Sequence, residues 1–339
     1  MQEDAEVHDA IVALLRRRPV TEAQPLHIVY VVDEAWLGNV LLETGRESLV
    51  ISFSIRELGK RLLCQSEFWF TVVVLRQKIM KKIRGTCSAI FRLVFDHHFL
   101  SPTGGLRNGG CILNVRDQTF VLFGTLSNAI CDGEKSRQAW ECKSGSAIKA
   151  CPLCQNVVSK HNVATPGSGL VCLDCSESWK FNLHTVGSLQ RDIQRAYSCL
   201  ADFAARRIGK GHCEEVIRAI GYEPSADGIW SDPRVAGIAS PVDALNFDCA
   251  HIFVSDGLLV GEMQFSVDES DGSLGDSYRR FAELGWTSSG RNGPPKASHK
   301  LQYCLDKGSF GGHTRPSASE VLSFMPLLLF WLSELLAAP

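Results

Sequence analysis

The sequence of this 339-residue chain predicts an α/β fold. Three short segments near its beginning are rich in β-branched and aromatic residues, which favour strands, and a longer segment with helical spacing follows them. The strand segments are PLHIVYVVDE, LVISFSI and FWFTVVVL, and the helical one is KKIRGTCSAIFRLVFDHHF. Strands followed by a helix and by further strands are typical of a sheet packed against helices.

Further elements are predicted in chain order around these segments. An amphipathic helix is expected over 5–18, before the first strand. After the glycine-rich SPTGGLRNGG, which ends the long helix, we expect the strands CILNV and TFVLFGTL, a short helix in GEKSRQAWEC and a surface helix in SLQRDIQRAYSCLADFAARRIG. Turns are expected over 222–241, helical or mixed structure over 246–267, a linker over 288–316, and a last helix from Ser317 or Ser319.

Composition and cysteine content exclude several protein classes. The hydrophobic share of 45% and the net charge of −2 are those of an ordinary globular protein, not of a disordered or fibrous one. The 13 cysteines are an odd number in a long chain, and the N-terminal MQEDAEVHDA is acidic where a signal peptide is basic and then apolar. We therefore expect a nuclear or cytoplasmic protein that is not secreted.

The C-terminal stretch VLSFMPLLLFWLSELLAAP is the candidate for a membrane span. A span needs about 20 mostly apolar residues, whereas Pro326 and Glu334 interrupt this one. We expect a buried helix here and no membrane partner.

A basic stretch contrasts with the balanced overall charge. From Arg56 to Arg92, nine Lys or Arg residues are opposed only by Glu57 and Glu67. Such a stretch either follows the phosphate backbone of a nucleic acid or forms a solvated helix face, and the sequence leaves both open. The nine residues are Arg56, Lys60, Arg61, Arg76, Lys78, Lys81, Lys82, Arg84 and Arg92.

Four cysteines have the spacing of a zinc ribbon. The segment CPLCQNVVSKHNVATPGSGLVCLDC follows the pattern C-x2-C-x17-C-x2-C. A two-residue gap lets a turn aim two thiolates at one tetrahedral Zn²⁺, whereas a thioredoxin-like redox pair needs a strand-to-helix junction. We expect structural zinc rather than four unrelated buried thiols, with His161 and His184 as spare ligands. The four predicted ligands are Cys151, Cys154, Cys172 and Cys175.

Three acidic residues occupy positions that favour a divalent metal site. Asp33 follows an apolar strand, Asp132 follows FVLFGTLSNAIC, and Glu320 lies in the first turn of the last helix. A carboxylate beside a core is costly without a partner, and three together would bind Mg²⁺ or Mn²⁺ and support phosphodiester chemistry. Taken alone, each acid is an ordinary surface charge.

A further pair, Asp248 and His251 in NFDCAHIF, has the pattern D-x-x-H. The three-residue spacing places both side chains on one face of a predicted helix. The pair is either part of a functional site or a local carboxylate–imidazole hydrogen bond.

The order of these motifs resembles the catalytic core of eukaryotic cut-and-paste DDE transposases. Over 26–336, the acid in VVDEAWLGN, the acid in AICDGEK, the inserted cysteines, the D-x-x-H and the acid in SASEVL are ordered as in the Plavaka and Kyakuja/Dileera/Zisupton groups, and more distantly hAT. CPLCQNVVSKH and DEAWLGN are also similar to segments of multicopy proteins from dinoflagellate genomes. Two departures are Leu37-Gly38-Asn39 in place of Pro-Gly-Asn, and Gly133 where relatives have another acid.

This resemblance implies a ribonuclease H-like mixed sheet flanked by helices, with a zinc-binding and helical insertion. It implies that Asp33, Asp132 and Glu320 are catalytic metal ligands. By the same likeness, Asp248 and His251 form the insertion motif. The implied divisions are 1–142 for the first part of the core, 143–185 for a zinc-ribbon-like module, 186–316 for the helical insertion and linker, and 317–339 for a terminal core helix.

The function that we favour from the sequence is that of a transposase-derived protein. It would bind DNA and cleave or join strands with Mg²⁺ or Mn²⁺. One alternative is a non-catalytic zinc-ribbon protein that binds nucleic acid or a protein partner. Another is a relic of a transposable element in which zinc only stabilises the fold. The sequence leaves the target DNA and the oligomeric state open.

Overall fold

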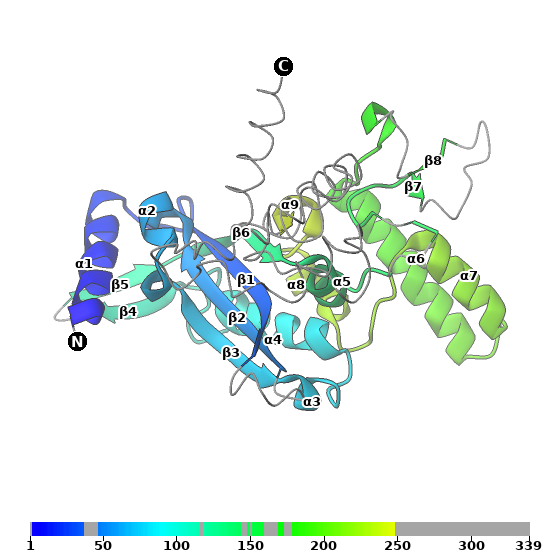
Figure 1. Cartoon of the computed structure of the whole chain (residues 1–339), viewed down its shortest axis with the longest axis horizontal. Helices are drawn as coiled ribbons and strands as arrows, with labels where there is room; N and C mark the ends of the chain where they lie inside the picture. The colour runs from blue at the N-terminus through cyan, green and yellow to red at the C-terminus, as the bar shows by residue number, and fades with distance from the viewer. Residues whose placement is uncertain are drawn as a thin grey trace, which may run out of the picture. The chain divides into compact units, whose positions relative to one another are not determined.

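The structure is a computed structural model that describes residues 2–36, 47–115, 118–143, 148–149, 151–158, 169–172 and 178–247. Apart from Phe247, these residues belong to one compact unit, 1–246. The predicted α/β class is confirmed, because a five-stranded mixed sheet packs with helices (Figure 1). None of the helices in these ranges is long and apolar enough to cross a bilayer. The predicted terminal helix, 317–339, lies outside the described residues.

The sheet has the strand order β3-β2-β1-β6-β9. β1 is antiparallel to β2 and parallel to β6, and β2 is antiparallel to β3. Strands β1, β3 and β6 therefore run in one direction and finish at the same end of the sheet. The strands are β1 (Leu26–Trp36), β2 (Glu47–Ile55), β3 (Phe70–Arg76), β6 (Gly124–Cys131) and β9 (Leu245–Phe247).

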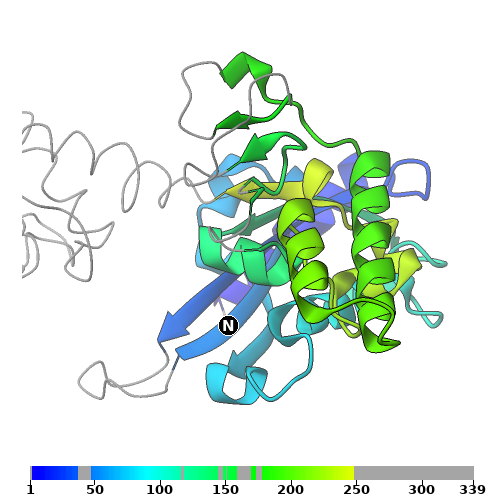
Figure 2. The same cartoon turned by 90° about the vertical axis from the view of Figure 1, so that its right-hand side faces the viewer.

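Helices and two small sheets surround this main sheet. α6 and α7 pack side by side as a helical hairpin (Figure 2). The longer helices are α1 (Gln2–Arg17), α4 (Thr86–Leu100), α5 (Gly133–Trp140), α6 (Val186–Ala204) and α7 (Lys210–Ile220). The short ones are η1 (Arg56–Leu58), α2 (Lys60–Leu63), η2 (Ser66–Phe68), α3 (Gln77–Met80), η3 (Ser178–Lys180), η4 (Ile229–Ser231), α8 (Pro233–Ala236) and α9 (Pro241–Ala244). The small sheets pair β4 (Cys111–Val115) with β5 (Gln118–Leu122), and β7 (Val157–Val158) with β8 (Val171–Cys172).

Some predicted elements have different limits in the structure. The segment TFVLFGTL is not one strand: β5 pairs with β4, and β6 pairs with β1 in the main sheet. Gly124 begins β6 against Ile28 and Leu106, whose side chains would lie 3.1–3.4 Å from an added Cβ. The long helix predicted from KKIRG begins only at Thr86, because Gly85 has a left-handed backbone with φ 79°.

One face of the main sheet packs against α4. Tyr30 and Val32 of β1 are buried, and the Tyr30 ring contacts Phe91 and Phe95 edge to face. The Tyr30 hydroxyl lies 2.6 Å from His98 Nδ1, and burial lowers the pKa of His98 to about 4, which keeps the imidazole neutral. Because side chains alternate along a strand, Asp33 projects from the opposite face.

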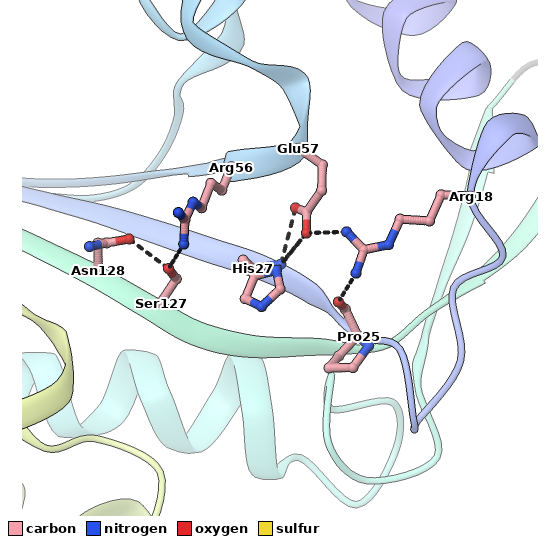
Figure 3. A network of polar contacts seen from close by, with 7 residues as sticks. All are labelled: Arg18, Pro25, His27, Arg56, Glu57, Ser127 and Asn128. Carbon is pink, nitrogen blue, oxygen red and sulfur yellow. Dashed lines mark hydrogen bonds and ion pairs between the residues drawn. The ribbon is translucent and has the colours of Figure 1, made fainter.

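At the end of the sheet where β1 begins, Glu57 joins three segments (Figure 3). Its carboxylate accepts hydrogen bonds from Arg18 Nη1 at 2.6 Å and from the His27 backbone N–H at 3.1 Å, and it lies 2.6 Å from His27 Nδ1. Burial tends to raise the pKa of Glu57, but the hydrogen bonds from His27 bring it below its usual value. Nearby, Arg56 Nη1 donates to Ser127 Oγ at 3.4 Å. The contacts of Glu57 fix the end of the sheet opposite to Asp33, whereas the exposed Arg56–Ser127 bond adds little.

Candidate functional site

Asp33 and Asp132 are side by side where two adjacent parallel strands stop pairing, although β1 itself continues beyond Asp33 to Trp36, paired with β2. The last paired residues of β1 and β6 are Val32 and Cys131, and each aspartate follows directly. Figure 1 shows these two strands running next to each other. Because neighbouring strands are about 4.8 Å apart, the fold places two acids that are distant in the sequence at neighbouring positions on the sheet.

The Asp33 carboxylate is exposed. Its Oδ1 accepts a hydrogen bond from the backbone N–H of Glu34 at 2.7 Å. Among the described residues, no lysine, arginine or histidine forms an ion pair with it. Its negative charge is therefore accessible to a cation.

Asp132 has a structural role that needs no metal. It is the N-cap of α5, and its Oδ1 accepts a hydrogen bond from the backbone N–H of Lys135 at 2.5 Å. Aspartate is one of the preferred residues at this position because its side chain satisfies a free N–H of the first helical turn. A metal site here would therefore share the Asp132 carboxylate with the helix.

Glu34 is held by other side chains, which separates its role from that of Asp33. It forms an ion pair with Lys135, whose side chain is only 3% exposed, and its Oε1 accepts a hydrogen bond from Gln77 Nε2 at 3.0 Å. Lys135 Nζ also lies 3.2 Å from Gln138 Oε1. Glu34 thus ties the end of β1 to the first turn of α5 and to the start of α3. Asp33 is the better candidate for a ligand.

Two buried thiols lie beneath the acids. Burial raises the pKa of Cys87 to about 12, and the nearby charges of Glu34 and Asp132 raise it while that of Lys135 lowers it. The pKa of Cys131 is raised by burial and then by Cys87, Asp132 and Asp33. Both thiols therefore stay protonated at neutral pH and are not nucleophiles in this arrangement.

The third predicted acid, Glu320, lies outside the described residues, and so do Asp248 and His251 of the insertion motif. Within the described ranges, no three His, Cys, Asp or Glu side chains are close enough together to hold a metal ion. The described part of the candidate site is thus the pair Asp33 and Asp132.

The first predicted zinc pair forms a compact thiol turn. The hydrogen bond from the Cys154 side chain lowers the pKa of Cys151 to about 6, against the effect of burial, and the backbone N–H groups of Leu153 and Cys154 contribute in the same direction. The same hydrogen bond, together with burial, raises the pKa of Cys154. A turn that directs N–H groups at a thiolate suits one half of a zinc site.

The other predicted zinc ligands are only partly described. Cys172 is paired with Val158 through the parallel strands β7 and β8, so it belongs to the same module as Cys154. Cys175 and the spare ligand His161 lie outside the described residues.

His184, the other spare ligand, is described. Its side chain is buried, and its backbone N–H donates to Leu153 O at 2.8 Å, which places it beside the thiol turn. Its Nδ1 lies 3.0 Å from Ser188 Oγ, while Nε2 has no hydrogen-bond partner among the residues that the structure describes. Nε2 of His184 is therefore the free nitrogen that a metal ligand at this position would use.

Two residues near the candidate sites were not found by sequence reasoning. Lys135 belongs to no recognisable sequence motif. It meets Glu34 only because β1 pairs with β6, which α5 follows. Cys142 lies close to the thiol turn, and its side chain hydrogen-bonds with Tyr222. Burial raises the pKa of Cys142 to about 12; the hydrogen bond with Tyr222 lowers this pKa, and the charge of Cys151 raises it further. The Tyr222 hydroxyl in turn donates to Pro152 O at 2.5 Å.

No protein-family model matches the chain, and none of the curated proteins matches it significantly. Its function is therefore inferred from its own residues.

Proposed function

We propose that this chain is a transposase-derived protein with a ribonuclease H-like core that binds DNA and cleaves or joins its strands. The placement of Asp33 and Asp132 directly after the last residue pair between β1 and β6 carries this proposal. A ribonuclease H-like sheet brings the ends of its first and fourth strands together, and β1 and β6 are the first and fourth strands of the main sheet in chain order. The antiparallel run of β1, β2 and β3 before the parallel β6 supports the same fold.

The two aspartates would supply the negative charge of the site. Close carboxylates repel each other, so a divalent cation between them is favourable. Bound Mg²⁺ or Mn²⁺ would activate the attacking hydroxyl or water and stabilise the leaving oxygen of a phosphodiester. The ion pair of Glu34 with Lys135 would hold the last part of β1 against the first turn of α5. Glu320 is proposed as a third ligand from the resemblance alone.

A nuclease assay on the wild type and on Asp33→Asn tests the catalytic proposal. The wild type should cleave duplex DNA or join strand ends only when Mn²⁺ or Mg²⁺ is added, and Asp33→Asn should abolish this activity because the amide carries no charge for a cation. DNA binding and zinc content should stay the same in both proteins. Equal metal-dependent activity in both would make the proposal wrong.

We also propose that the module around Cys151 holds one structural zinc ion. The thiol turn of Cys151 and Cys154 supplies two of the four ligands, and the described residues place no third ligand beside it. Cys172 and Cys175 would complete the site, with His184 as the alternative because its buried Nε2 has no hydrogen-bond partner among the described residues. Zinc would then stabilise the module by linking its two halves.

Metal analysis of the full chain, purified without chelator, should find about one zinc per molecule. Cys151→Ser combined with Cys154→Ser should remove it, and should make the module the first region that proteases cut. The matched control is Cys199→Ser with Cys213→Ser, two thiols that touch each other between α6 and α7. Zinc-free wild type, or full zinc in the Cys151 and Cys154 double variant, would contradict this proposal.

A second candidate function is a non-catalytic zinc-ribbon protein that binds nucleic acid or a protein. The observation that favours it is the exposure of large apolar side chains on the module, with Trp179 74% and Leu183 62% exposed. Asn156 anchors the segment that carries both side chains, since its Nδ2 donates to Lys180 O at 2.9 Å, and it also donates to Gly169 O, before β8, at 3.1 Å. Binding of DNA without metal-dependent cleavage would favour this second function.

A further inference from the structure

The basic stretch of the sequence is split by the fold into two separate groups. Arg56, Lys60 and Arg61 precede β3, whereas Arg76 is its last residue and Lys78, Lys81, Lys82 and Arg84 follow closely; Arg92 lies apart in α4. β3 runs from Phe70 to Arg76, a length of roughly 20 Å at about 3.3 Å per residue. Figure 1 shows α2 and α3 at opposite ends of this strand. Only the second group is at the end of the sheet where Asp33 lies.

Strand pairing places Arg76 on the same face as Asp33. Asp33 is paired with Val50, and Val50 with Val74, so these three side chains project from one face. Arg76 is two residues beyond Val74 on β3 and therefore projects from that face as well. Two strand spacings and two residues along the strand separate the Asp33 and Arg76 Cα atoms by roughly 12 Å.

The neighbouring helix α3 is anchored so that its cations face solvent. Gln77 donates to Glu34 at 3.0 Å and Met80 is buried, which fixes one side of α3 against the protein. The basic side chains between and after them are exposed, and the sequence from Phe70 to Arg84 contains no Asp or Glu. We call the exposed group Arg76, Lys78, Lys81 and Lys82 the α3 basic strip.

The α3 basic strip carries uncompensated charge. Arg84, next to the strip, forms an ion pair with Asp227 at 3.2 Å, but none of the four strip residues has an ion-pair partner among the described residues. Four like charges on so short a segment repel one another, and a polyanion relieves this repulsion while releasing its own counterions. The charge and exposure of the strip, and the position of Arg76 on the face of Asp33, favour an extended anionic ligand.

We propose that the α3 basic strip binds the phosphate backbone of DNA and directs one strand toward Asp33 and Asp132. The second half of this proposal rests on the proposed function, whereas the binding itself does not. A separation of roughly 12 Å corresponds to three or four base-pair steps along the axis of a duplex, at about 3.4 Å per step. Arg76 would then contact a phosphate a few nucleotides away from the one held at the aspartates.

The test compares two variants that each remove three charges. The strip variant is Lys78→Gln, Lys81→Gln and Lys82→Gln; the control is Arg56→Gln, Lys60→Gln and Arg61→Gln, which alters the other end of β3. Binding of a fluorescent 30-base-pair duplex is measured without divalent ions, in full-length protein, from about 50 to 200 mM salt. In the strip variant, the slope of log affinity against log salt should fall in magnitude by about 2.7, or about 0.9 per lost phosphate contact.

The control variant should retain nearly the wild-type slope, and both variants should keep the wild-type circular dichroism and thermal midpoint. Equal slopes in the two variants would overturn the proposal, because the strip would then act only as a solvated surface. The same titration in an Asp33→Asn background separates the two proposals. A strip effect that persists there, without cleavage by the wild type, would support the binding surface and reject the catalytic function.

Discussion

Asp132→Asn should lose metal-dependent DNA cleavage while retaining the wild-type stability. Asparagine keeps a side-chain oxygen that can accept the hydrogen bond from the Lys135 backbone N–H, and it is as good an N-cap as aspartate. It lacks the negative charge that a divalent cation requires. If the cation contributes several kcal/mol to the transition state, the rate should fall by about 10³-fold or more.

Asp132→Ala is the matched variant, because it removes the charge and the cap together. It should lose cleavage equally and should also lower the free energy of unfolding by about 1 kcal/mol. Urea unfolding and the Mn²⁺-dependent cleavage rate, measured on both variants, separate the two roles of Asp132. If Asp132→Asn cleaves DNA as fast as the wild type, Asp132 is only a helix cap and the catalytic pair is wrong.

The sequence was sufficient to predict the fold class and the main strands. Runs such as HIVYVV and LVISFSI have β-branched residues that suit a buried, pleated surface, and the structure has strands there. It could not predict that TFVLFGTL changes sheets at Phe123, since a continuous apolar run gives no signal for a change of pairing partner. The late start of α4 depends similarly on the left-handed Gly85.

For the candidate site, the sequence indicated which acids follow strands but not what surrounds them. Glu34 forms an ion pair with Lys135, whereas Asp33 has no ion-pair partner among the described residues; this difference depends on which side of β1 each residue occupies. The proximity of Cys142 to Cys151 depends on Tyr222, which comes from a distant part of the chain. Such contacts arise from tertiary packing, which local patterns do not encode.

Glu141 is another residue whose role only the structure reveals. It ends α5 in a left-handed conformation with φ 58°, and its carboxyl is buried, with 9% of the residue exposed. Oε1 accepts a hydrogen bond from the Ser225 backbone N–H at 2.9 Å, while Oε2 has no hydrogen-bond partner in the described part of the chain. An added Cβ at Gly228 would lie only 1.7 Å from Oε1, so the loop before η4 closes tightly over the carboxyl.

Burial raises the pKa of Glu141 to about 8, although the hydrogen bonds from Ser225 and Ser88 act in the opposite direction. The carboxyl is therefore mostly neutral in the folded protein at pH 7, whereas in the unfolded chain it ionises near pH 4.3. Between these values the folded state binds one more proton than the unfolded state. Stability from this group is thus complete below about pH 4.3 and is lost as pH rises toward 8.

Glu141→Gln should remove this pH dependence, because the amide keeps the shape and the acceptor for Ser225 but cannot ionise. From pH 5 to pH 8.5, the free energy of unfolding of the wild type should fall relative to that of the variant by about 4 kcal/mol, at 1.36 kcal/mol per pKa unit. Urea titrations of both proteins across this range measure the difference directly, and other titrating groups cancel in the comparison. Parallel curves would mean that the Glu141 carboxyl is ionised in the folded protein at neutral pH. The loop from Ser225 to Gly228 would then have to open or admit water to solvate that charge, since no described residue hydrogen-bonds to Oε2.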